Sequence, residues 1–405
     1  MDEQGVEGFL LRPARVWDGR APRPVENVHV LVKGERIRGV GRGISSAGAC
    51  PVPVDLPGCT LLPGLIDCHV HLPDEGADED SALYQVLTAV PAMQAVLANG
   101  FTTVRDLGSS HQPLNVALRR AVADGLVRGP RILAAPNMIS PRGGHADKAP
   151  RLAERYGAQI GTVADGVEEI RRQVRAQGRY GADWIKYAGS GGFSSPADAP
   201  NSVAYSQEEV DALVGAARDV RLPCAVHAVS DEAVARAVRA GVRSVEHGSL
   251  ATEGTLEMMA RSGTFLVPTQ YCQIEALNRL ETTGSRTGLC GQADCVSAEE
   301  VRDGLRRQGR SEVRIAFGSD AGMFPHADNW QEFPALVAHG LTPLRALRSA
   351  TVTAAELLGL PELGSITPGF IADLVAVDGD PFTDIGSMGL VRFVMQQGKI
   401  VHHTN

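Results

Sequence analysis

Two histidines separated by a single residue occur in the sequence Asp67-Cys68-His69-Val70-His71, which follows the apolar run of residues 60–66. Alternate side chains of a β-strand point to the same face, so His69 and His71 are expected to point the same way. Two imidazoles on one face at the carboxyl end of a strand provide half of a metal site. The sequence therefore predicts that the remaining ligands come from other parts of the chain.

The central part of the chain alternates short apolar segments with longer amphipathic ones. Strands are predicted at residues 62–66, 102–105, 131–134, 184–187, 225–226, 244–246, 265–267 and 315–317. Helices are predicted between them, including 167–177, 207–219, 231–240 and a last helix over 344–358, which follows Thr342 as N-cap and Pro343 in the first turn. Eight strands that each precede a helix indicate an α/β fold, a (β/α)8 TIM barrel, whose functional residues lie at the carboxyl ends of the strands.

These strand ends carry a set of side chains that suit a metal ion. They are His69 and His71 after the first strand, Lys186 at the fourth, His227 at the fifth, His247 at the sixth and Asp320 after the eighth. A single histidine at a strand end is more often hydrogen-bonded structure than a ligand, and Asp320 alone could cap the next helix. The coincidence of all six at one barrel mouth favours a site for zinc or a similar divalent ion, such as manganese or cobalt.

Lys186 calls for separate treatment, because an ammonium group beside divalent ions would be repelled and burial would lower its pKa. A neutral amine can add carbon dioxide to form a carbamate, an anion with two oxygens that could bridge two metal ions. The alternative is a lysine that points outward or pairs with an acid. Its place at a strand end among ligands favours the carbamate.

The two ends of the chain share another pattern. Short strands separated by turns are predicted at residues 9–11, 28–32 and 36–40, and again at 372–377 and 391–395, with a turn at 397–399. We therefore expect one discontinuous β-sandwich domain, residues 1–61 and 362–405, beside a barrel of residues 62–361.

Composition narrows the class of protein. The 405 residues are 43% apolar and 21% charged, which is ordinary for a globular enzyme. A net charge of −8 without a block of Lys or Arg argues against nucleic acid as a partner. No apolar segment is long enough to span a membrane, and no signal peptide is recognisable. Seven cysteines without a regular framework, with Cys68 and Cys224 in apolar runs, fit buried thiols and a cytoplasmic location.

Three segments allow two interpretations each. The acidic stretch 74–80 could bind a cation or form a solvated loop. Cys290 and Cys295 could have a redox or zinc role, although two thiols without a nearby histidine are a weak signal. The polar segment 275–297 is predicted to be a long loop, either a lid over the barrel mouth or an insertion.

These residues and motifs resemble the amidohydrolase superfamily with a binuclear metal centre, in the branch of Xaa-Pro dipeptidase-like and ochratoxinase-like amidases. The resemblance covers nearly the whole chain. It is carried by residues 63–71, 100–106 and 143–147, by Lys186 and His227, by 246–248 and 318–320, and by the segment 364–374. It implies that the two chain ends form a small β-sandwich beside the barrel.

The resemblance also implies roles for the ligands. His69 and His71 would bind the more buried ion, His227 and His247 the second, carboxylated Lys186 both, and Asp320 the first. A hydroxide that bridges the two ions, expected to be zinc, would attack an amide carbonyl, and Asp320 would pass the proton to the leaving nitrogen.

Substrate contacts are less specific in the sequence. By resemblance His145, in a Gly-Gly-His turn, would contact the substrate and often its carboxylate; a structural loop histidine is the alternative. Related dipeptidases often carry a tyrosine two residues after the fifth-strand histidine, where this chain has Val229. Arg142 or Tyr271 could replace it as a substrate contact, and His326 could line the pocket or order its loop.

The resulting hypothesis is a metal-dependent amide hydrolase for a small dipeptide-like or N-acyl amino acid substrate, with a homo-oligomer as a further expectation. The alternative is a cyclic-amide ring-opening hydrolase or a deaminase on the same scaffold. Deaminases of this superfamily usually work with one metal and lack the bridging lysine, so Lys186 counts against deamination. A non-enzymatic barrel is a third possibility, against which the full ligand set argues.

Overall fold

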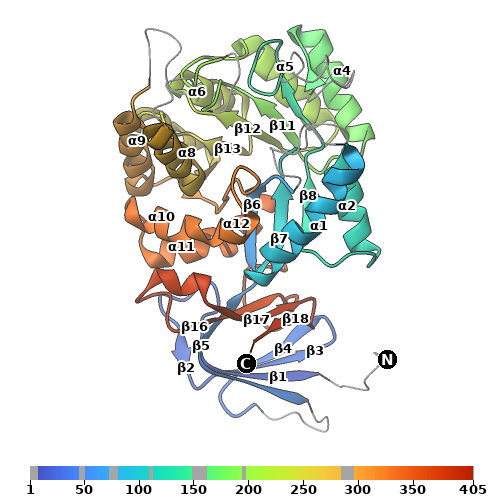
Figure 1. The fold of residues 1–405 in the computed structure, drawn as a ribbon, viewed down its shortest axis with the longest axis vertical. Helices are drawn as coiled ribbons and strands as arrows, with labels where there is room; N and C mark the ends of the chain where they lie inside the picture. Colours follow the sequence, from blue (N-terminus) through green and yellow to red (C-terminus); the bar gives the residue numbers. More distant parts are fainter. Residues whose placement is uncertain are drawn as a thin grey trace.

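The computed structural model describes residues 8–44, 51–72, 81–108, 113–147, 162–193, 198–283 and 296–404. Figure 1 shows a barrel surrounded by helices and, below it, a smaller β module that contains both ends of the chain. The acidic stretch 74–80 and the cysteines at 290 and 295 lie outside the described residues.

The β module is an eight-stranded sheet built from both ends of the chain. Its strands are β1 (Phe9–Val16), β2 (Val25–Glu26), β3 (His29–Lys33), β4 (Arg36–Gly41), β5 (Val52–Pro63), β16 (Leu374–Asp378), β17 (Val391–Gln396) and β18 (Lys399–His403). The order is β18-β17-β16-β5-β1-β3-β4, with β2 beside β1. Because β5 pairs with β1 on one side and with β16 on the other, the two chain ends share one sheet, as expected. The domain boundaries at 61/62 and 361/362 stay a prediction.

The second group of strands forms the barrel. It comprises β6 (Leu65–Val70), β7 (Phe101–Asp106), β8 (Arg131–Ala134), β9 (Met138–Ser140), β10 (Thr162–Val163), β11 (Ile185–Ala188), β12 (Cys224–Ala228), β13 (Ser244–His247), β14 (Phe265–Val267) and β15 (Arg314–Ile315). The pairings run β6-β7-β8 and β10-β9-β11-β12-β13-β14-β15, all parallel.

Backbone hydrogen bonds close the barrel at its two seams. The amide of Cys68 donates to the carbonyl oxygen of Phe317 at 2.8 Å, and the amide of Asp183 donates to that of Ala134 at 2.8 Å. The first bond joins β6 to the segment after β15, and the second joins the approach to β11 with β8. The predicted TIM barrel is therefore confirmed.

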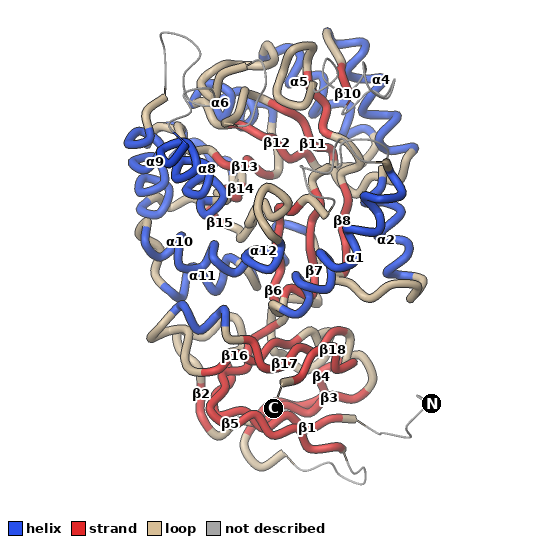
Figure 2. The backbone as a smooth tube through the Cα atoms, in the orientation of Figure 1, coloured by secondary structure: helices blue, strands red, loops and turns tan. Residues whose placement is uncertain are grey.

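Helices surround the barrel strands (Figure 2). They are α1 (Ala82–Ala98), α2 (Leu114–Ala123), α4 (Gly166–Arg179), α5 (Gln207–Asp219), α6 (Asp231–Ala240), α7 (Glu253–Ser262), α8 (Gln270–Thr283), α9 (Ala298–Arg310), α10 (Glu332–Ala338), α11 (Pro343–Ser349) and α12 (Val352–Leu358), with 3-10 helices η2 (His326–Gln331) and η3 (Ile385–Gly389). Local signals define several ends: a capping box at Ser206 begins α5, and left-handed Gly241 ends α6. No helix in the described part of the chain is long and apolar enough to cross a membrane.

The first barrel strand differs from its prediction at residues 62–66. The prediction spans the end of β5 and the start of β6, which are separated at Gly64. A Cβ at Gly64 would lie 2.5 Å from Thr102 Oγ1, so the chain can pass from the module into the barrel there only with glycine. His69 therefore lies within β6, and His71 directly follows it.

The predicted last helix, 344–358, is wrong in its continuity, because α11 ends at Ser349 and α12 starts at Val352. The carbonyl oxygens of Ser349 and Ala350 accept hydrogen bonds from the amides of Phe317 and Ile66. A continuous helix would use these carbonyls internally, so their bonds to the barrel strands account for the break. The predicted N-cap is confirmed: Thr342 accepts from the amide of Arg345, with Pro343 in the first turn.

The predicted loop 275–297 is also wrong over its first part. Residues 275–283 belong to α8, residues 284–295 lie outside the described ones, and α9 starts at Ala298 after the capping box of Ser297.

Candidate active site

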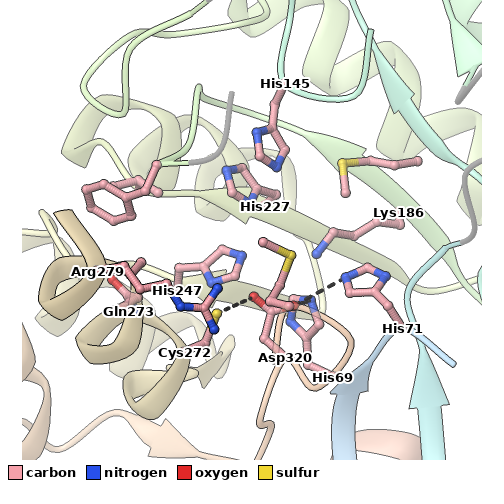
Figure 3. A pocket seen from close by; sticks show the side chains of 15 residues that line it. His69, His71, His145, Lys186, His227, His247, Cys272, Gln273, Arg279 and Asp320 are labelled. Carbon is pink, nitrogen blue, oxygen red and sulfur yellow. Dashed lines mark hydrogen bonds and ion pairs between the residues drawn. The ribbon is translucent and has the colours of Figure 1, made fainter. Parts of the chain in front are cut away.

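A cavity of about 240 Å³ opens at the carboxyl ends of the barrel strands, and all six predicted metal ligands line it. Figure 3 shows these side chains converging from several barrel strands and from the segments that follow β6 and β15. The ligating atoms of His69, His247 and Asp320 lie within 4.8 Å of one another. The structure thus brings together residues that are as much as 251 positions apart in the chain, from 69 to 320.

A buried network fixes the orientation of His69. Its Nδ1 lies 3.0 Å from Oε2 of Glu246, and Oε1 of Glu246 accepts from Arg105 and Ser244 at 3.0 and 2.6 Å. Arg105 also donates to the carbonyl oxygen of Cys68 at 2.6 Å, which ties the network to β6. Because Glu246 takes one ring nitrogen, Nε2 of His69 faces the cavity.

The other histidines are oriented in the same way, each through one ring nitrogen. Nδ1 of His71 bonds to the carbonyl oxygen of Gly108 at 2.9 Å, and Nδ1 of His247 lies 2.7 Å from Oγ1 of Thr269. His227 is reversed, since its Nε2 bonds to the carbonyl oxygen of Gly191 at 3.1 Å. Each imidazole therefore keeps one nitrogen for the cavity, the arrangement typical of metal-ligating histidines.

Three acceptor atoms face one another around Asp320. Oδ1 of Asp320 lies 3.3 Å from Nε2 of His69 and 3.3 Å from Nε2 of His71. The Nδ1 atoms of both histidines already face acceptors, so a neutral ring keeps its proton on Nδ1 and presents a lone pair at Nε2. Lone pairs that converge on a carboxylate oxygen repel one another unless a proton or a metal ion lies among them. This donor set therefore fits a divalent metal ion.

Burial supports the neutral form of the His69, His227 and His247 rings. It lowers the pKa of His69 and of His247 well below the ordinary value, and it lowers the pKa of His227 to about 4. Neutral imidazoles are the form that binds metal ions, since protonation removes the lone pair.

Asp320 and His247 have positive φ angles of 64° and 70°, a backbone conformation that residues other than glycine rarely adopt. The amide of Asp320 donates to the carbonyl oxygen of His69 at 2.7 Å, which holds the strained residue against β6. A Cβ at Gly318 would lie 2.8 Å from Cβ of His69, so this approach requires glycine. Strained residues of this kind concentrate at functional sites.

Lys186 carries a buried polar group of the site that has no hydrogen-bond partner. It is 1% exposed, lines the cavity, and its Nζ has no hydrogen-bond partner. Burial lowers the pKa of the Lys186 ammonium group to about 8. A buried amine without a partner is costly unless another group occupies the space in front of it.

The predicted substrate contacts are only partly brought together. His145 lines the cavity, and its ring stacks on that of His227 with centroids 3.9 Å apart. Arg142 is absent from the lining; it is exposed and pairs with Asp165. Tyr271 packs on Phe324 outside the lining.

His326 is buried and is also absent from the lining. Its Nε2 bonds to the carbonyl oxygen of His71 at 2.9 Å, so it orders the chain that carries a predicted ligand. Of the two interpretations of His326, this placement favours the ordering of its loop.

One wall of the cavity comes from α8, which was not predicted. Cys272, Gln273, Ala276 and Arg279 line the cavity, and the thiol of Cys272 donates to Oδ2 of Asp320 at 3.3 Å. The only sequence signal for this wall is helical spacing within a polar segment. The rest of the lining is apolar and consists of Met138, Phe193, Val229 and Met323.

The thiols of Cys68 and Cys224 are buried and free, as expected. Burial raises the pKa of the Cys224 thiol to about 12 and also raises that of Cys68. Both groups are therefore structural rather than reactive.

A TIM barrel with this donor set at its mouth defines a metal-dependent hydrolase, and residues 60–401 match the model of the amidohydrolase family. The chain belongs to that family. It is 32% identical over 373 residues to ochratoxinase from Aspergillus niger, an alignment that covers 85% of this chain and 74% of that protein.

Solved structures agree with this assignment. A Xaa-Pro dipeptidase with methionine bound in the active site matches with a TM-score of 0.88 and 32% identity, over 98% of this chain and all (100%) of that one. A prolidase complexed with N-methylphosphonate-L-proline matches with a TM-score of 0.84 and 35% identity, over 98% and 100% of the two chains. The protein is a hydrolase that acts on carbon–nitrogen bonds.

Proposed function

We propose that this protein hydrolyses the amide bond of a small dipeptide-like or N-acyl amino acid substrate with two divalent metal ions, expected to be zinc. In this proposal His69, His71 and Asp320 would hold one ion, His227 and His247 would hold the other, and Lys186, as a carbamate, would be a ligand of both. A homo-oligomer remains a prediction.

The observation that carries the proposal is the buried, unpartnered amine of Lys186 among the histidines. An ammonium group there would oppose the binding of cations, whereas a carbamate would supply an anion. The lowered pKa favours the neutral amine, which is the form that adds carbon dioxide. One buried lysine thus supports both the bridge and the number of ions.

The bound ions would supply the attacking hydroxide, by lowering the pKa of a shared water, and would polarise the amide carbonyl. Asp320 would hold the proton of that water and deliver it to the leaving nitrogen. Its Oδ2 accepts from Cys272, which orients the carboxylate. His145, stacked on His227 at the edge of the cavity, would contact the substrate.

The substrate class is supported by the cavity and by the relatives. Met138, Phe193, Val229 and Met323 offer apolar contact to an acyl group or an amino acid side chain. Two similar proteins were crystallised with methionine and with N-methylphosphonate-L-proline, both of which carry an amino acid carboxylate.

A screen of zinc-loaded enzyme tests the proposal. The substrates are N-acyl amino acids, dipeptides and cyclic amides, and the readout is release of the free amine. Hydrolysis of linear substrates by the wild type, and its loss in Asp320→Asn, would support the proposal. Turnover of cyclic amides alone, or equal release by the variant, would contradict it.

A further inference from the structure

Helix α8 presents one face to the cavity. Cys272, Ala276 and Arg279 line it and are spaced by four and three residues, so they lie on the same side of the helix. Figure 3 shows Arg279 beside Cys272 and Gln273 at the cavity. The guanidinium group therefore belongs to the wall of the active site.

The inner end of α8 is held firmly against the site. The carboxylate of buried Glu332 accepts from the amides of Gln270 and Tyr271 at 2.9 and 2.7 Å, which caps the first turn. Cys272 donates to Asp320 in the same turn. The position of Arg279 is consequently tied to that of the reacting groups.

Arg279 lies seven residues beyond Cys272, which corresponds to about 10 Å along the helix axis. Arg279 is exposed, whereas Asp320 and Lys186 are buried. The cavity is thus lined by buried predicted metal ligands and by Arg279, an exposed residue about two helical turns farther along α8 than Cys272. Among the described residues that line the cavity, Arg279 is the only basic side chain other than His145 and the predicted metal ligands.

We propose that Arg279 binds the carboxylate of the substrate and so selects acylated amino acids over neutral amides. A guanidinium group binds a carboxylate through two parallel charge-assisted hydrogen bonds. A substrate whose scissile amide lies at the base of the cavity would direct its carboxylate outward toward α8. This inference rests on the proposed function and names the residue that gives it specificity.

The experiment compares N-benzoyl-L-phenylalanine with N-(2-phenylethyl)benzamide, which has the same single amide but no carboxylate. Both kcat/KM and the calorimetric Kd are measured for the wild type, Arg279→Met and Arg142→Met. In Arg279→Met, loss of the bidentate contact should lower kcat/KM for N-benzoyl-L-phenylalanine by about 10-fold or more. The kcat/KM for the neutral amide should stay unchanged. Arg142→Met, which alters an exposed arginine outside the cavity, should match the wild type.

Salt provides a second readout, because an exposed guanidinium group is screened by ions. The preference of the wild type for the carboxylate should decline between low and high ionic strength, and that of Arg279→Met should not. Arg279→Lys should recover only part of the preference, since an ammonium group cannot form the paired bonds.

The outcomes separate this inference from the proposed function. One outcome is that the wild type hydrolyses N-benzoyl-L-phenylalanine and that Arg279→Met lowers kcat/KM equally for both compounds, or for neither. This result overturns the role of Arg279 and leaves amide hydrolysis standing. Binding of the carboxylate that depends on Arg279, without turnover of either compound, supports the anchor and contradicts the proposed function. Failure of the wild type to bind the carboxylate overturns the inference.

Discussion

Nδ1 of His69 lies 3.0 Å from Oε2 of Glu246, and both side chains are almost fully buried, at 1% and 0% exposure. Arg105 pairs with the other carboxylate oxygen of Glu246, so the negative charge is balanced from behind while the imidazole faces the cavity. The contacts from Arg105 to Glu246 and from Glu246 to His69 thus leave Nε2 of His69 as the nitrogen that could bind a metal ion.

Glu246→Gln tests this relationship. The amide cannot serve as an anionic acceptor for both the ring and Arg105, so the affinity for zinc should fall by about 10- to 100-fold. Competition with a chromogenic chelator measures it. Glu257→Gln, which alters an exposed glutamate on α7, should leave the affinity unchanged. Equal zinc affinity in wild type and Glu246→Gln would show that His69 needs no such support.

Asp320→Asn tests proton transfer. The substitution preserves size, so the circular dichroism spectrum should stay that of the wild type. kcat should fall by about 100-fold or more, the range for loss of a general acid–base group. The rate is measured with the best substrate of the screen at saturating zinc. An unimpaired kcat would remove Asp320 from the reaction.

The pH dependence of carbon dioxide uptake follows from the pKa of Lys186, which burial lowers to about 8. Only the neutral amine reacts, and its fraction rises about tenfold per pH unit below that pKa and levels off above it. Metal-free enzyme at a fixed concentration of dissolved carbon dioxide should therefore incorporate ¹³C label faster as the pH rises to about 8. Carbamate formation followed by ¹³C NMR checks this, and a pH-independent rate would contradict it.

The same shift affects the stability of the metal-free protein. The unfolded chain holds a proton on this amine up to its ordinary pKa of 10.5, whereas the folded chain releases it near 8. Between these values the unfolded state binds more protons, so this group makes the folded state more stable as the pH rises through that window. Denaturant titrations at pH 8 and pH 10 measure the unfolding free energy of wild type and Lys186→Met. The variant should lack the part of the increase between these pH values that Lys186 contributes.

Glu332→Ala tests the anchoring of α8. Removal of the carboxylate leaves two buried amides without a partner, and each should cost about 1–3 kcal/mol of unfolding free energy. Because α8 forms a wall of the cavity, KM should rise more than kcat falls. Glu332→Gln retains one acceptor and should be intermediate in chemical denaturation. An unchanged free energy of unfolding in Glu332→Ala would show that α8 is held elsewhere.

The barrel, and the meeting of the six candidate metal ligands in one cavity, could be predicted because the signals for the strands and helices are local. The strand at 131–134 and the helices at 207–219 and 231–240 match β8, α5 and α6. The convergence of the ligands follows from barrel geometry, since every strand ends at the same mouth.

The features that were missed depend on distant partners. The first amides of helix α8 are capped by Glu332, which lies 62 positions from Gln270 in the chain. The break between α11 and α12 has no glycine or proline to mark it, since residues 349–352 are Ser-Ala-Thr-Val and the cause is bonding to Phe317 and Ile66. Arg279 was overlooked for the same reason as the helix that carries it.

Metal content of wild type and Lys186→Ala is the most direct test of the central claim, that two ions share a site bridged by residue 186. Both proteins are loaded with zinc in the presence of bicarbonate, freed of excess metal, and analysed by elemental mass spectrometry. We expect two ions per chain in the wild type, and no more than one in Lys186→Ala, with most activity lost. One ion in the wild type, or two in Lys186→Ala, would contradict it.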